Sequence, residues 1–376
     1  MSVLLPDHLV RLGFTSLEVG AIVTGTLLGS AALTVGLGLA GHRFEQRRVL
    51  LAASVLMLAT GLAFAGLSGF WPLLAIAILG TLNPSAGDVS EFLPAEQAAL
   101  AQAVPARQRT RAFASYNVSG NLAGALGALA SGAPALAAHR YGGDVGLAER
   151  CGFLVYAATA LVVAAVYTRL RGSADATTPT ASAPLVRSRR IVLQLSALFS
   201  LDAFGGGFVV QSLLVLWLYR RFGLRVEGAA AIFFATGLVG ACSQFVSGRL
   251  AARIGLIQTM VYTHVPANVF LVLAGVAPTA PLAVAFLLLR ALLSQMDVPA
   301  RQAYVMAVVP PEERAAAASV TNVPRSLASA IPPLFTGLML DRTVAGWPLV
   351  CGGLLKLAYD ALLLARFRAV PPLPEP

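Results

Sequence analysis

The chain has 376 residues, of which 57% are hydrophobic and only 12% are charged, and its mean hydropathy is +0.77. A soluble domain does not need so much apolar surface, so this composition excludes a soluble globular protein. The formal net charge of +10 does not predict nucleic-acid binding, because the basic residues lie at the ends of long apolar runs. We therefore expect a protein that spans a lipid bilayer.

Membrane-spanning helices follow one another along the chain. A helix needs about 20 apolar residues to cross the hydrocarbon. Residues 1–10 are predicted to be the end of a first helix, and eleven complete helices follow. They cover residues 17–40, 49–67, 71–103, 113–138, 151–168, 191–218, 228–250, 256–277, 281–308, 315–340 and 346–366. The predicted fold class is an all-α polytopic membrane protein.

The basic residues are divided unevenly between the two ends of these helices. Sixteen of the 27 arginine and lysine residues fall on the side of the linker at 169–190, and seven fall on the opposite side. Cytoplasmic loops carry an excess of arginine and lysine. Both termini are therefore predicted to lie in the cytoplasm, and we expect the inner membrane of a bacterium.

The two halves of the chain repeat each other. Residues 11–22 align with 221–232 at an offset of 210, and residues 93–118 align with 298–323 at an offset of 205, with ten identities in 26 pairs. Such repeats in an apolar chain are typical of secondary transporters built from two like bundles. The repeat predicts bundles at 1–168 and 191–368, a linker rich in Ser, Thr and Pro at 169–190, and a tail at 369–376.

The repeat also predicts that the first helix is incomplete. Met1 corresponds to Gln211, whereas the matching helix of the second half begins near Ile191. We therefore expect roughly twenty residues, the length of one span, to precede Met1 in the true protein.

A short motif between the second and third helices suggests a family. Residues 38–47 read GLAGHRFEQR, with Gly38, His42 and Arg43 at its central positions, and a weaker copy at 248–255 contains Gly248 and Arg253. With two six-helix bundles and a central linker, this pattern resembles the Major Facilitator Superfamily. The resemblance implies that the glycines let helices approach closely and that the arginines anchor a turn which controls conformational change. His42 stands where that family has an acidic residue.

The resemblance also implies that the first, fourth, seventh and tenth helices line a central cavity. The stretch DVPARQAYVMAVVPPEER at 297–314 is similar to one in bacterial facilitators described as drug-efflux proteins. We expect a monomer in the lipid bilayer that binds a small molecule and protons, without nucleic acid.

Ionisable side chains within spans indicate the site, because each costs several kcal/mol in hydrocarbon unless it faces protein or water. On the tenth helix, Arg290, Ser294, Asp297 and Arg301 have a spacing that predicts one polar stripe. We interpret the first three as binding residues for substrate or protons. The alternative is an Arg290–Asp297 pair that only braces the bundle.

The fourth helix contains three carboxylates, Asp88, Glu91 and Glu96. A buried carboxylate can take up and release a proton near neutral pH, so Asp88 and Glu91 are predicted to bind substrate or protons. Glu96 corresponds to Arg301 in the repeat, and these two residues are predicted to form a gate.

The seventh helix contributes Asp202, about 16 Å from its start at Ile191, as a proton or cation site. Gly205, Gly206 and Gly207 follow it and suit either close packing or a hinge. Gln211 lies further along the same span and is a further candidate for the binding site.

Two other features are predicted to be structural. Lys356 and Asp360 are spaced to neutralise each other on the twelfth helix. His264 is interpreted as a hydrogen-bonded packing residue, although it could titrate.

No enzyme, metal or cofactor site is predicted, because the four histidines lack ligand spacing and no phosphate-binding loop occurs. Three functions remain: proton-coupled efflux of a small molecule by alternating access, symport or uniport uptake of an organic anion, and a non-transporting scaffold or sensor.

Overall fold

The computed structural model describes residues 1–40, 46–82, 84, 96, 100, 109–169 and 185–368. Every regular element within these residues is a helix, and nine helical segments among them are long and apolar enough to cross a membrane. The predicted all-α polytopic fold is confirmed. Four candidate site residues lie outside the described residues, and expectations for them stay predictions: His42, Arg43, Asp88 and Glu91.

The chain divides into two compact units, and neither is a single stretch of sequence. The first contains Met1–Pro179 and Val210–Phe234, and the second contains Thr180–Val209 and Ala235–Pro376. The predicted seventh helix is therefore divided between the units. The bundle boundaries that the repeat predicts, 1–168 and 191–368, stay predictions.

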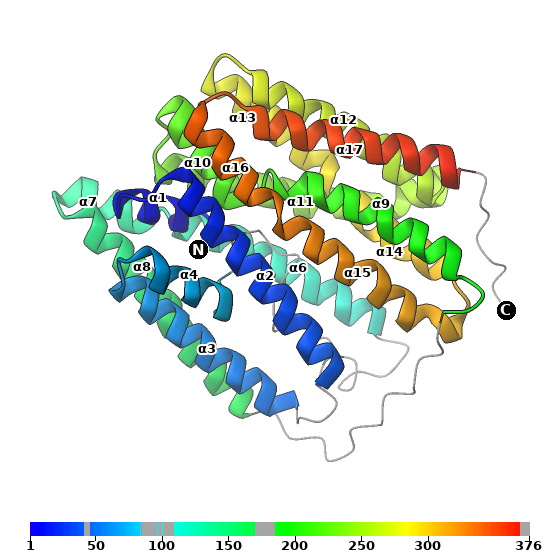
Figure 1. Cartoon of the computed structure of the whole chain (residues 1–376), viewed down its shortest axis with the longest axis horizontal. Helices are drawn as coiled ribbons and strands as arrows, with labels where there is room; N and C mark the ends of the chain where they lie inside the picture. The colour runs from blue at the N-terminus through cyan, green and yellow to red at the C-terminus, as the bar shows by residue number, and fades with distance from the viewer. Residues whose placement is uncertain are drawn as a thin grey trace. The chain divides into compact units, whose positions relative to one another are not determined.

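In the first unit, α3 (Gln46–Gly66) runs beside α8 (Val145–Thr168), and α2 (Ser16–Ala40) packs against α4 (Phe70–Leu79) (Figure 1). The other helices of this unit are α1 (Leu4–Arg11), α6 (Arg109–Ala130), α7 (Ala133–Tyr141) and α10 (Gln211–Phe222). Because α1 packs against both α8 and α10, it ties residues from the start of the chain to residues beyond 210.

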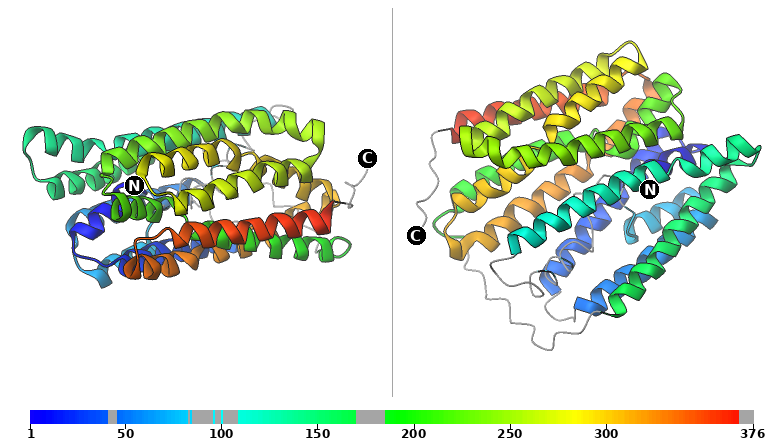
Figure 2. Two further views of the ribbon diagram at one scale, coloured as in Figure 1. Left: turned by 90° about the horizontal axis from the view of Figure 1, so that it is seen from above. Right: turned by 180° about the vertical axis from the view of Figure 1, so that it is seen from behind.

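In the second unit, α9 (Arg189–Gly207) packs against α15 (Arg314–Ala330) and α17 (Trp347–Phe367). Beside α17 runs α12 (Leu256–Val276), as both views of Figure 2 show. The remaining elements are α13 (Ala280–Ser294), α14 (Asp297–Ala307), the 3-10 turn η3 (Pro311–Glu313) and α16 (Pro332–Arg342). The long helix α11 (Val226–Ile254) has residues in both units.

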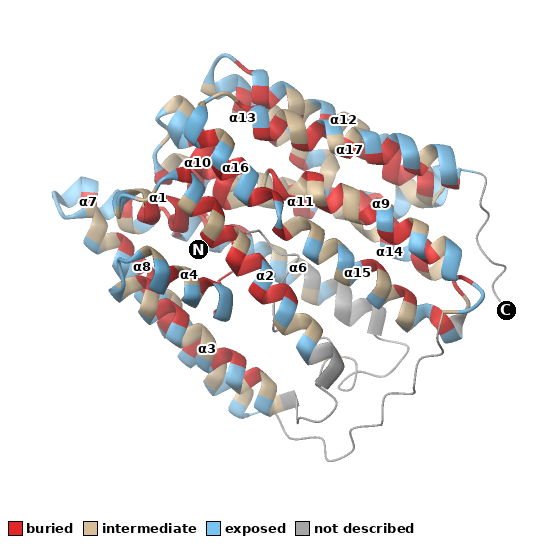
Figure 3. Ribbon diagram, in the orientation of Figure 1, coloured by how far each residue is buried: buried red, intermediate tan, exposed pale blue. Residues whose placement is uncertain are grey.

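Burial differs strongly between helices. Buried positions are dense along α9, whereas α3 and α8 show many intermediate and exposed ones (Figure 3). The exposed side chains of α3 and α8 are largely apolar, for example Val55, Leu62 and Leu161. In a protein that spans a bilayer, such apolar faces contact lipid. Asp202, the acidic residue of α9, is buried and is therefore enclosed by protein.

Four spans that the sequence predicts as continuous helices are broken. Residues 113–138 are divided between α6 and α7, 191–218 between α9 and α10, 281–308 between α13 and α14, and 315–340 between α15 and α16. Glycines weaken the helix at 205–207, and Pro332 removes a backbone donor at the start of α16.

Side-chain hydroxyls satisfy carbonyls that these breaks leave free. Thr336 Oγ1 donates to the carbonyl oxygen of Phe208 at 3.0 Å, just after α9. Ser247 Oγ donates to the carbonyl oxygen of Met296 at 2.5 Å, between α13 and α14. Because hydrocarbon offers no hydrogen bonds, such partners allow a helix to stop inside the membrane.

The structure repeats one feature at an offset found in the sequence. After α1 and α10, Gly13 and Gly223 have positive φ angles of 89° and 65°, and they are 210 residues apart. Both halves therefore place a glycine with left-handed backbone just after the corresponding helix. Asn117 lies in α6 and Asn322 lies in α15, and their predicted correspondence stays a prediction. Pro94, the predicted partner of Pro299, lies outside the described residues.

The described residues show no close approach at Gly248, and its predicted role stays a prediction. Gly248 is exposed on α11, and a Cβ atom built there would meet nothing within 4 Å. Arg253, at the end of the same helix, is also exposed, and Gly38 lies in the last turn of α2. A close approach does occur at Gly29, where a Cβ atom would lie 1.8 Å from the backbone oxygen of Ile78.

We predict that Gly29→Ala destabilises the protein whereas Gly36→Ala does not. Both glycines lie in α2, but a Cβ atom at Gly36 would meet nothing within 4 Å of the described residues. Forcing α2 away from α4 should cost about 1–3 kcal/mol, and the matched variant should be neutral or stabilised by up to about 1 kcal/mol. Thermal unfolding of both variants in the same detergent measures the difference. Equal melting temperatures would contradict the described α2–α4 packing.

A buried carboxylate fixes the last residues of the linker. Glu313 accepts hydrogen bonds from the backbone amides of Val186, Arg187 and Ser188 at 2.9–3.1 Å, and from the Ser188 hydroxyl. These bonds stabilise the ionised form, with that from the Ser188 hydroxyl contributing most, and lower the pKa of Glu313 from 4.5 to about 2. The residues just before α9 are therefore held by a charged group at the start of α15.

We predict that Glu313→Gln loosens this attachment. Trypsin should cleave after Arg187, Arg189 and Arg190 several-fold faster than in the wild type, because the charge-assisted bonds are lost. Glu312→Gln is the control, since Glu312 is exposed. In the wild type, protection of amides 186–188 from hydrogen exchange should be complete above pH 4.5 and decline as the pH falls toward 2, because a lowered pKa stabilises the folded state only while the carboxylate is ionised. Equal cleavage of the two variants would refute this role.

Candidate functional site

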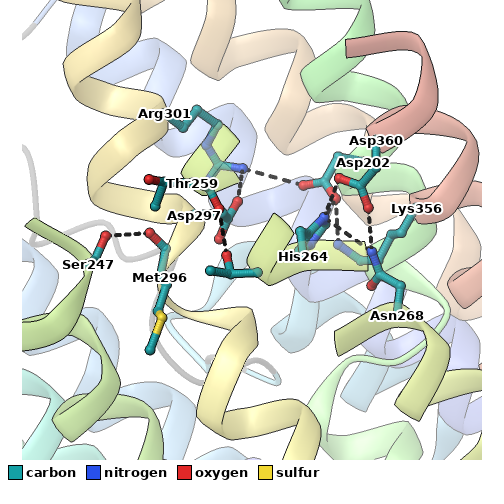
Figure 4. A network of polar contacts seen from close by, with 11 residues as sticks. Asp202, Ser247, Thr259, His264, Asn268, Met296, Asp297, Arg301, Lys356 and Asp360 are labelled. Atoms are coloured by element: carbon teal, nitrogen blue, oxygen red, sulfur yellow. Dashed lines mark hydrogen bonds and ion pairs between the residues drawn. The ribbon is translucent and has the colours of Figure 1, made fainter. Parts of the chain in front are cut away.

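A buried ion pair connects two helices of the second unit. Lys356 Nζ, on α17, donates to Asp202 Oδ1, on α9, at 2.6 Å. Arg301 Nη1, on α14, donates to the other oxygen of Asp202, Oδ2, at 3.3 Å. Figure 4 shows these side chains converging from their three helices. One carboxylate therefore links α9, α14 and α17.

A histidine joins this pair to a second carboxylate. His264 Nδ1, on α12, lies 2.9 Å from Asp360 Oδ1, and Asn268 Nδ2 donates to Asp360 Oδ2 at 2.9 Å. The other ring nitrogen of His264, Nε2, lies 3.7 Å from Asp202 Oδ1. His264 thus stands between two carboxylates (Figure 4).

Two residues near the break in the tenth span complete the site. Asp297 Oδ2 lies 3.5 Å from Arg301 Nη1, one helical turn away on α14. Arg290, on α13, interacts electrostatically with Asp202 and Asp297, and its Nε is buried without a hydrogen-bond partner among the described residues. We use the term polar cluster for seven residues, which are Asp202, His264, Asn268, Asp297, Arg301, Lys356 and Asp360.

All members of the polar cluster are buried, with 0–7% of their surface exposed. An unpaired charge in such surroundings costs several kcal/mol, so its partners decide whether it is tolerated. Among the described residues, Asp202 forms ion pairs with Lys356 and Arg301, Asp297 forms one with Arg301, and Arg290 interacts electrostatically with both carboxylates. Asp360 contacts an imidazole and an amide. The charge of Asp360 therefore depends on where the proton of its histidine partner lies.

Close packing of two glycines sets up the ion pair. A Cβ atom at Gly205 would lie 3.0 Å from the backbone oxygen of Gly352, and one at Gly352 would lie 2.7 Å from that of Gly205. Residues three or four apart share a helix face. Asp202 precedes Gly205 by three residues and Lys356 follows Gly352 by four, so the approach of α9 and α17 brings both side chains together.

Apolar side chains enclose the cluster on the side of the α9 N-terminus. Phe199, on α9, and Tyr359, on α17, belong to the hydrophobic core of this unit, together with Met260 on α12. The guanidinium of Arg301 lies 5.6 Å from the centre of the Phe199 ring, and the His264 ring meets Tyr359 edge to face. Excluding water in this way strengthens each ion pair.

The structure brings together part of the predicted site. Asp202, Asp297 and Arg301 lie in the polar cluster, with Arg290 beside it. Ser294 is half-buried at the end of α13, and the break after it interrupts the predicted stripe. Gln211 begins α10, in the first unit. The transport roles of these residues stay predictions.

Glu96 has partners within its own unit. It accepts hydrogen bonds from the hydroxyls of Tyr116, on α6, and Tyr167, on α8. Arg301, its predicted partner in a gate, contacts Asp202 and Asp297. The gate stays a prediction, and it requires both residues to exchange these partners.

One pairing inferred from spacing is wrong. Lys356 was expected to pair with Asp360, but it contacts Asp202, and Asp360 contacts His264 and Asn268. His264 is hydrogen-bonded as expected, but its partner is a carboxylate. The signal in the sequence was two polar pairs four residues apart, His264 with Asn268 and Lys356 with Asp360, within otherwise apolar spans. In the described part of the chain, no group of three His, Cys, Asp or Glu residues could hold a metal ion.

Comparison with known proteins identifies the family. The pattern of the Major Facilitator Superfamily matches residues 1–333, and the chain belongs to this superfamily. It is thus a multi-pass membrane protein of a transporter family. A relative in Saccharomyces cerevisiae, the uncharacterized membrane protein YJR124C, is 26% identical over 404 residues, covering 96% of this chain and 88% of the yeast protein.

Solved structures of transporters share the fold. The xylose transporter XylE from E. coli, in a partially occluded inward-open conformation, has a TM-score of 0.75 and 14% identity over 99% of this chain and 94% of its own. The nucleoside transporter NupG has a TM-score of 0.71 and 11% identity, over 98% of this chain and 94% of its own. A bacterial homologue of the human lysosomal transporter Spinster has a TM-score of 0.70 and 16% identity, over 98% of this chain and 93% of its own. At these identities, the likeness establishes the fold alone.

We predict strong coupling between Asp202 and Lys356 in a double-mutant cycle. Asp202→Asn or Lys356→Gln alone should destabilise the protein by about 3–5 kcal/mol, because each leaves a buried charge with too few partners. The double variant should lose at least about 1 kcal/mol less than the sum. The control cycle removes the pair of His139 and Glu227, whose side chains are 39% and 20% exposed, and should give at most about 1 kcal/mol of coupling. Unfolding by denaturant in detergent micelles measures both, and additive losses at Asp202 and Lys356 would show that the pair is energetically unimportant.

Proposed function

We propose that this protein is a secondary active transporter that exports a small organic molecule by alternating access, in exchange for protons. Membership of the superfamily supports a transporter, and the polar cluster supports coupling to protons. Its three carboxylates and its histidine are enclosed by membrane-spanning helices, where titratable groups are rarely present without a function.

The observation that carries this proposal is the position of Asp202. Its carboxylate holds Lys356 through one oxygen and Arg301 through the other. A proton bound by Asp202, or by a group next to it, would weaken the attraction between this carboxylate and its cations, and so weaken the link between α9, α14 and α17. Proton binding would in this way change the packing of three helices, which alternating access requires.

The proposal includes a location. The excess of arginines on one side supports cytoplasmic termini, and we propose a monomer in the inner membrane of a bacterium. Similarity of residues 297–314 to drug-efflux proteins supports export and a broad class of amphipathic substrates.

A second candidate is uptake of an organic anion. Arg290 Nε is buried without a hydrogen-bond partner among the described residues, and this donor would suit a carboxylate or phosphate group. Its interaction with Asp202 and Asp297 weighs against this candidate, because those carboxylates already lower the local positive potential.

We predict that amphipathic cations dissipate a pH gradient in proteoliposomes only when Asp202 is intact. Liposomes with an acidic interior and a trapped pH-sensitive dye receive tetraphenylphosphonium or ethidium, and the interior should become alkaline several-fold faster than in empty liposomes. Asp202→Asn should abolish the increase, because the coupling carboxylate is lost, and Glu312→Gln, an exposed carboxylate, should retain it.

Other outcomes separate the alternatives. Equal responses from the wild type and Asp202→Asn would remove Asp202 as the coupling group. A response only to organic anions such as p-aminohippurate, lost in Arg290→Gln, would establish the second candidate. No response to any compound in a folded protein would favour a non-transporting scaffold or sensor.

A further inference from the structure

The chain contains one lysine, and it lies in the polar cluster. Of the 27 basic residues that arginine and lysine supply, 26 are arginine and the remaining one is Lys356. Arginine presents a rigid planar fork, whereas lysine carries a compact charge on a flexible stem and can change partners more easily. The only lysine is thus the partner of Asp202 on α17, and the more rigid Arg301 is its partner on α14.

Lys356 and His264 approach the same oxygen atom. Lys356 Nζ lies 2.6 Å from Asp202 Oδ1, and His264 Nε2 lies 3.7 Å from that oxygen, while Arg301 occupies Oδ2. An imidazole that gains a proton at Nε2 becomes a donor aimed at Oδ1. It would then compete with Lys356, and the bond to Arg301 could persist.

The environment of Asp360 determines which nitrogen of His264 is free. Asp360 is fully buried, and its contacts in the described part of the chain are His264 Nδ1 and Asn268 Nδ2. A buried carboxylate is tolerated when donors satisfy both its oxygens. The Asn268 amide nitrogen also lies 3.1 Å from Nδ1, but the carboxylate of Asp360 is closer, at 2.9 Å, and is the stronger partner because it is charged. We therefore assign the proton of the neutral imidazole to Nδ1, where it is donated to Asp360, and Nε2 is left with a lone pair facing Asp202.

Charged and titratable groups surround this histidine, either directly or through a shared partner. Asp202 from α9 and Tyr359 and Asp360 from α17 lie next to its ring. Lys356 and Arg301 contact the same Asp202, Asp297 contacts Arg301, and Arg290 from α13 interacts electrostatically with Asp202 and Asp297. Two of these, Asp202 and Asp360, are carboxylates next to its two nitrogens. An imidazolium bridging them would satisfy both ring N–H groups.

A displaced Lys356 has acceptors close by. A Cβ atom at Gly206 would lie 3.7 Å from Lys356 Nζ and 3.6 Å from Cε, so the ammonium lies next to the last turn of α9. The final carbonyls of a helix form the negative end of its dipole, and the carbonyl oxygen of Gly206, which accepts from the Val209 amide at 3.0 Å, has a second lone pair for a further donor. The end of α9 at Gly207 therefore offers a place for the ammonium beside Asp202.

We propose that Nε2 of His264 is the binding site of the coupled proton, and that its occupation displaces Lys356 from Asp202. The incoming proton forms an N–H bond at Nε2, and the imidazolium donates to Asp202 Oδ1. The hydrogen bond from Lys356 to that oxygen breaks, and the ammonium keeps its charge and moves toward the last turn of α9. Release of the proton reverses the exchange. This inference rests on the proposed coupling to protons, and it assigns the proton to α12 rather than to Asp202 itself.

Nitrogen NMR of the detergent-solubilised protein tests this exchange without a substrate. Because Lys356 is the only lysine, a single signal from ε-¹⁵N-labelled lysine reports its partner. Ring-¹⁵N-labelled histidine gives signals for four residues, and the His264 signal is identified by its loss in His264→Gln. If that variant does not fold, replacing His8, His42 and His139 by Gln leaves His264 alone. Lowering the pH from 8 to 5 should convert His264 from the Nδ1-protonated to the doubly protonated form. The Lys356 signal should shift with the same midpoint.

Two variants sharpen the test. Asp360→Asn removes the charge that holds the Nδ1 proton, so the joint shift of His264 and Lys356 should be lost or its midpoint should move by at least about one pH unit. His139→Gln, which removes an exposed histidine of the first unit, should leave the joint shift unchanged.

Specific results would overturn the proposal. A Lys356 signal that stays constant while His264 gains its proton would show that the two do not compete. A His264 signal that does not change between pH 8 and 5 would show that it binds no proton in this range. The NMR titration requires no transport, so its result is independent of the pH-gradient assay with wild-type and Asp202→Asn proteoliposomes. Failure of this inference can therefore be distinguished from failure of the proposed function. Coupled transport with no joint NMR shift would leave the proton on Asp202.

Discussion

Asp202 and Lys356 lie 2.6 Å apart among membrane-spanning helices, and the packing of the second unit depends on their contact. Neither charge could be buried there alone, because an unpaired ion in hydrocarbon costs several kcal/mol. The contact requires α9 and α17 to approach until Gly205 and Gly352 touch, and any larger side chain at either position would separate them. Arg301 and His264 then join the same carboxylate from α14 and α12, so four helices are arranged around one charged group.

The helix breaks follow from a related constraint. A helix that stops inside a membrane leaves carbonyls without partners, and here Thr336 and Ser247 donate to carbonyls at two such points. The break after Ser294 places Arg290 on α13 and Asp297 on α14. Asp297 pairs with Arg301 on its own helix, and Arg290 Nε has no hydrogen-bond partner among the described residues. Local interruptions of helices thus decide which charges meet.

The superfamily fold supports different chemistries, as its structural relatives show. Transporters of xylose and of nucleosides share this architecture at 14% and 11% identity. Specificity therefore depends on the side chains of the site. In this chain, the carboxylate of Asp202 has one partner with a rigid planar head, Arg301, and one with a flexible stem, Lys356. This asymmetry is the physical basis of the proton-dependent exchange proposed for His264.

The sequence by itself determined the class of the protein, because apolar runs and the internal repeat depend only on residue order. Membrane spans, the family motif and the positions of Asp202, Asp297 and Arg301 within spans could all be predicted in this way. Only the tertiary structure decided which charges pair. Spacing along one helix predicted Lys356 with Asp360, whereas packing of α9 against α17 placed Lys356 on Asp202 and left Asp360 to His264. Pairing between helices depends on how closely the helices approach and on how each is rotated about its axis. Glycine contacts and helix breaks set both the distance and the rotation. The period of a single helix, about 3.6 residues, carries no information about either.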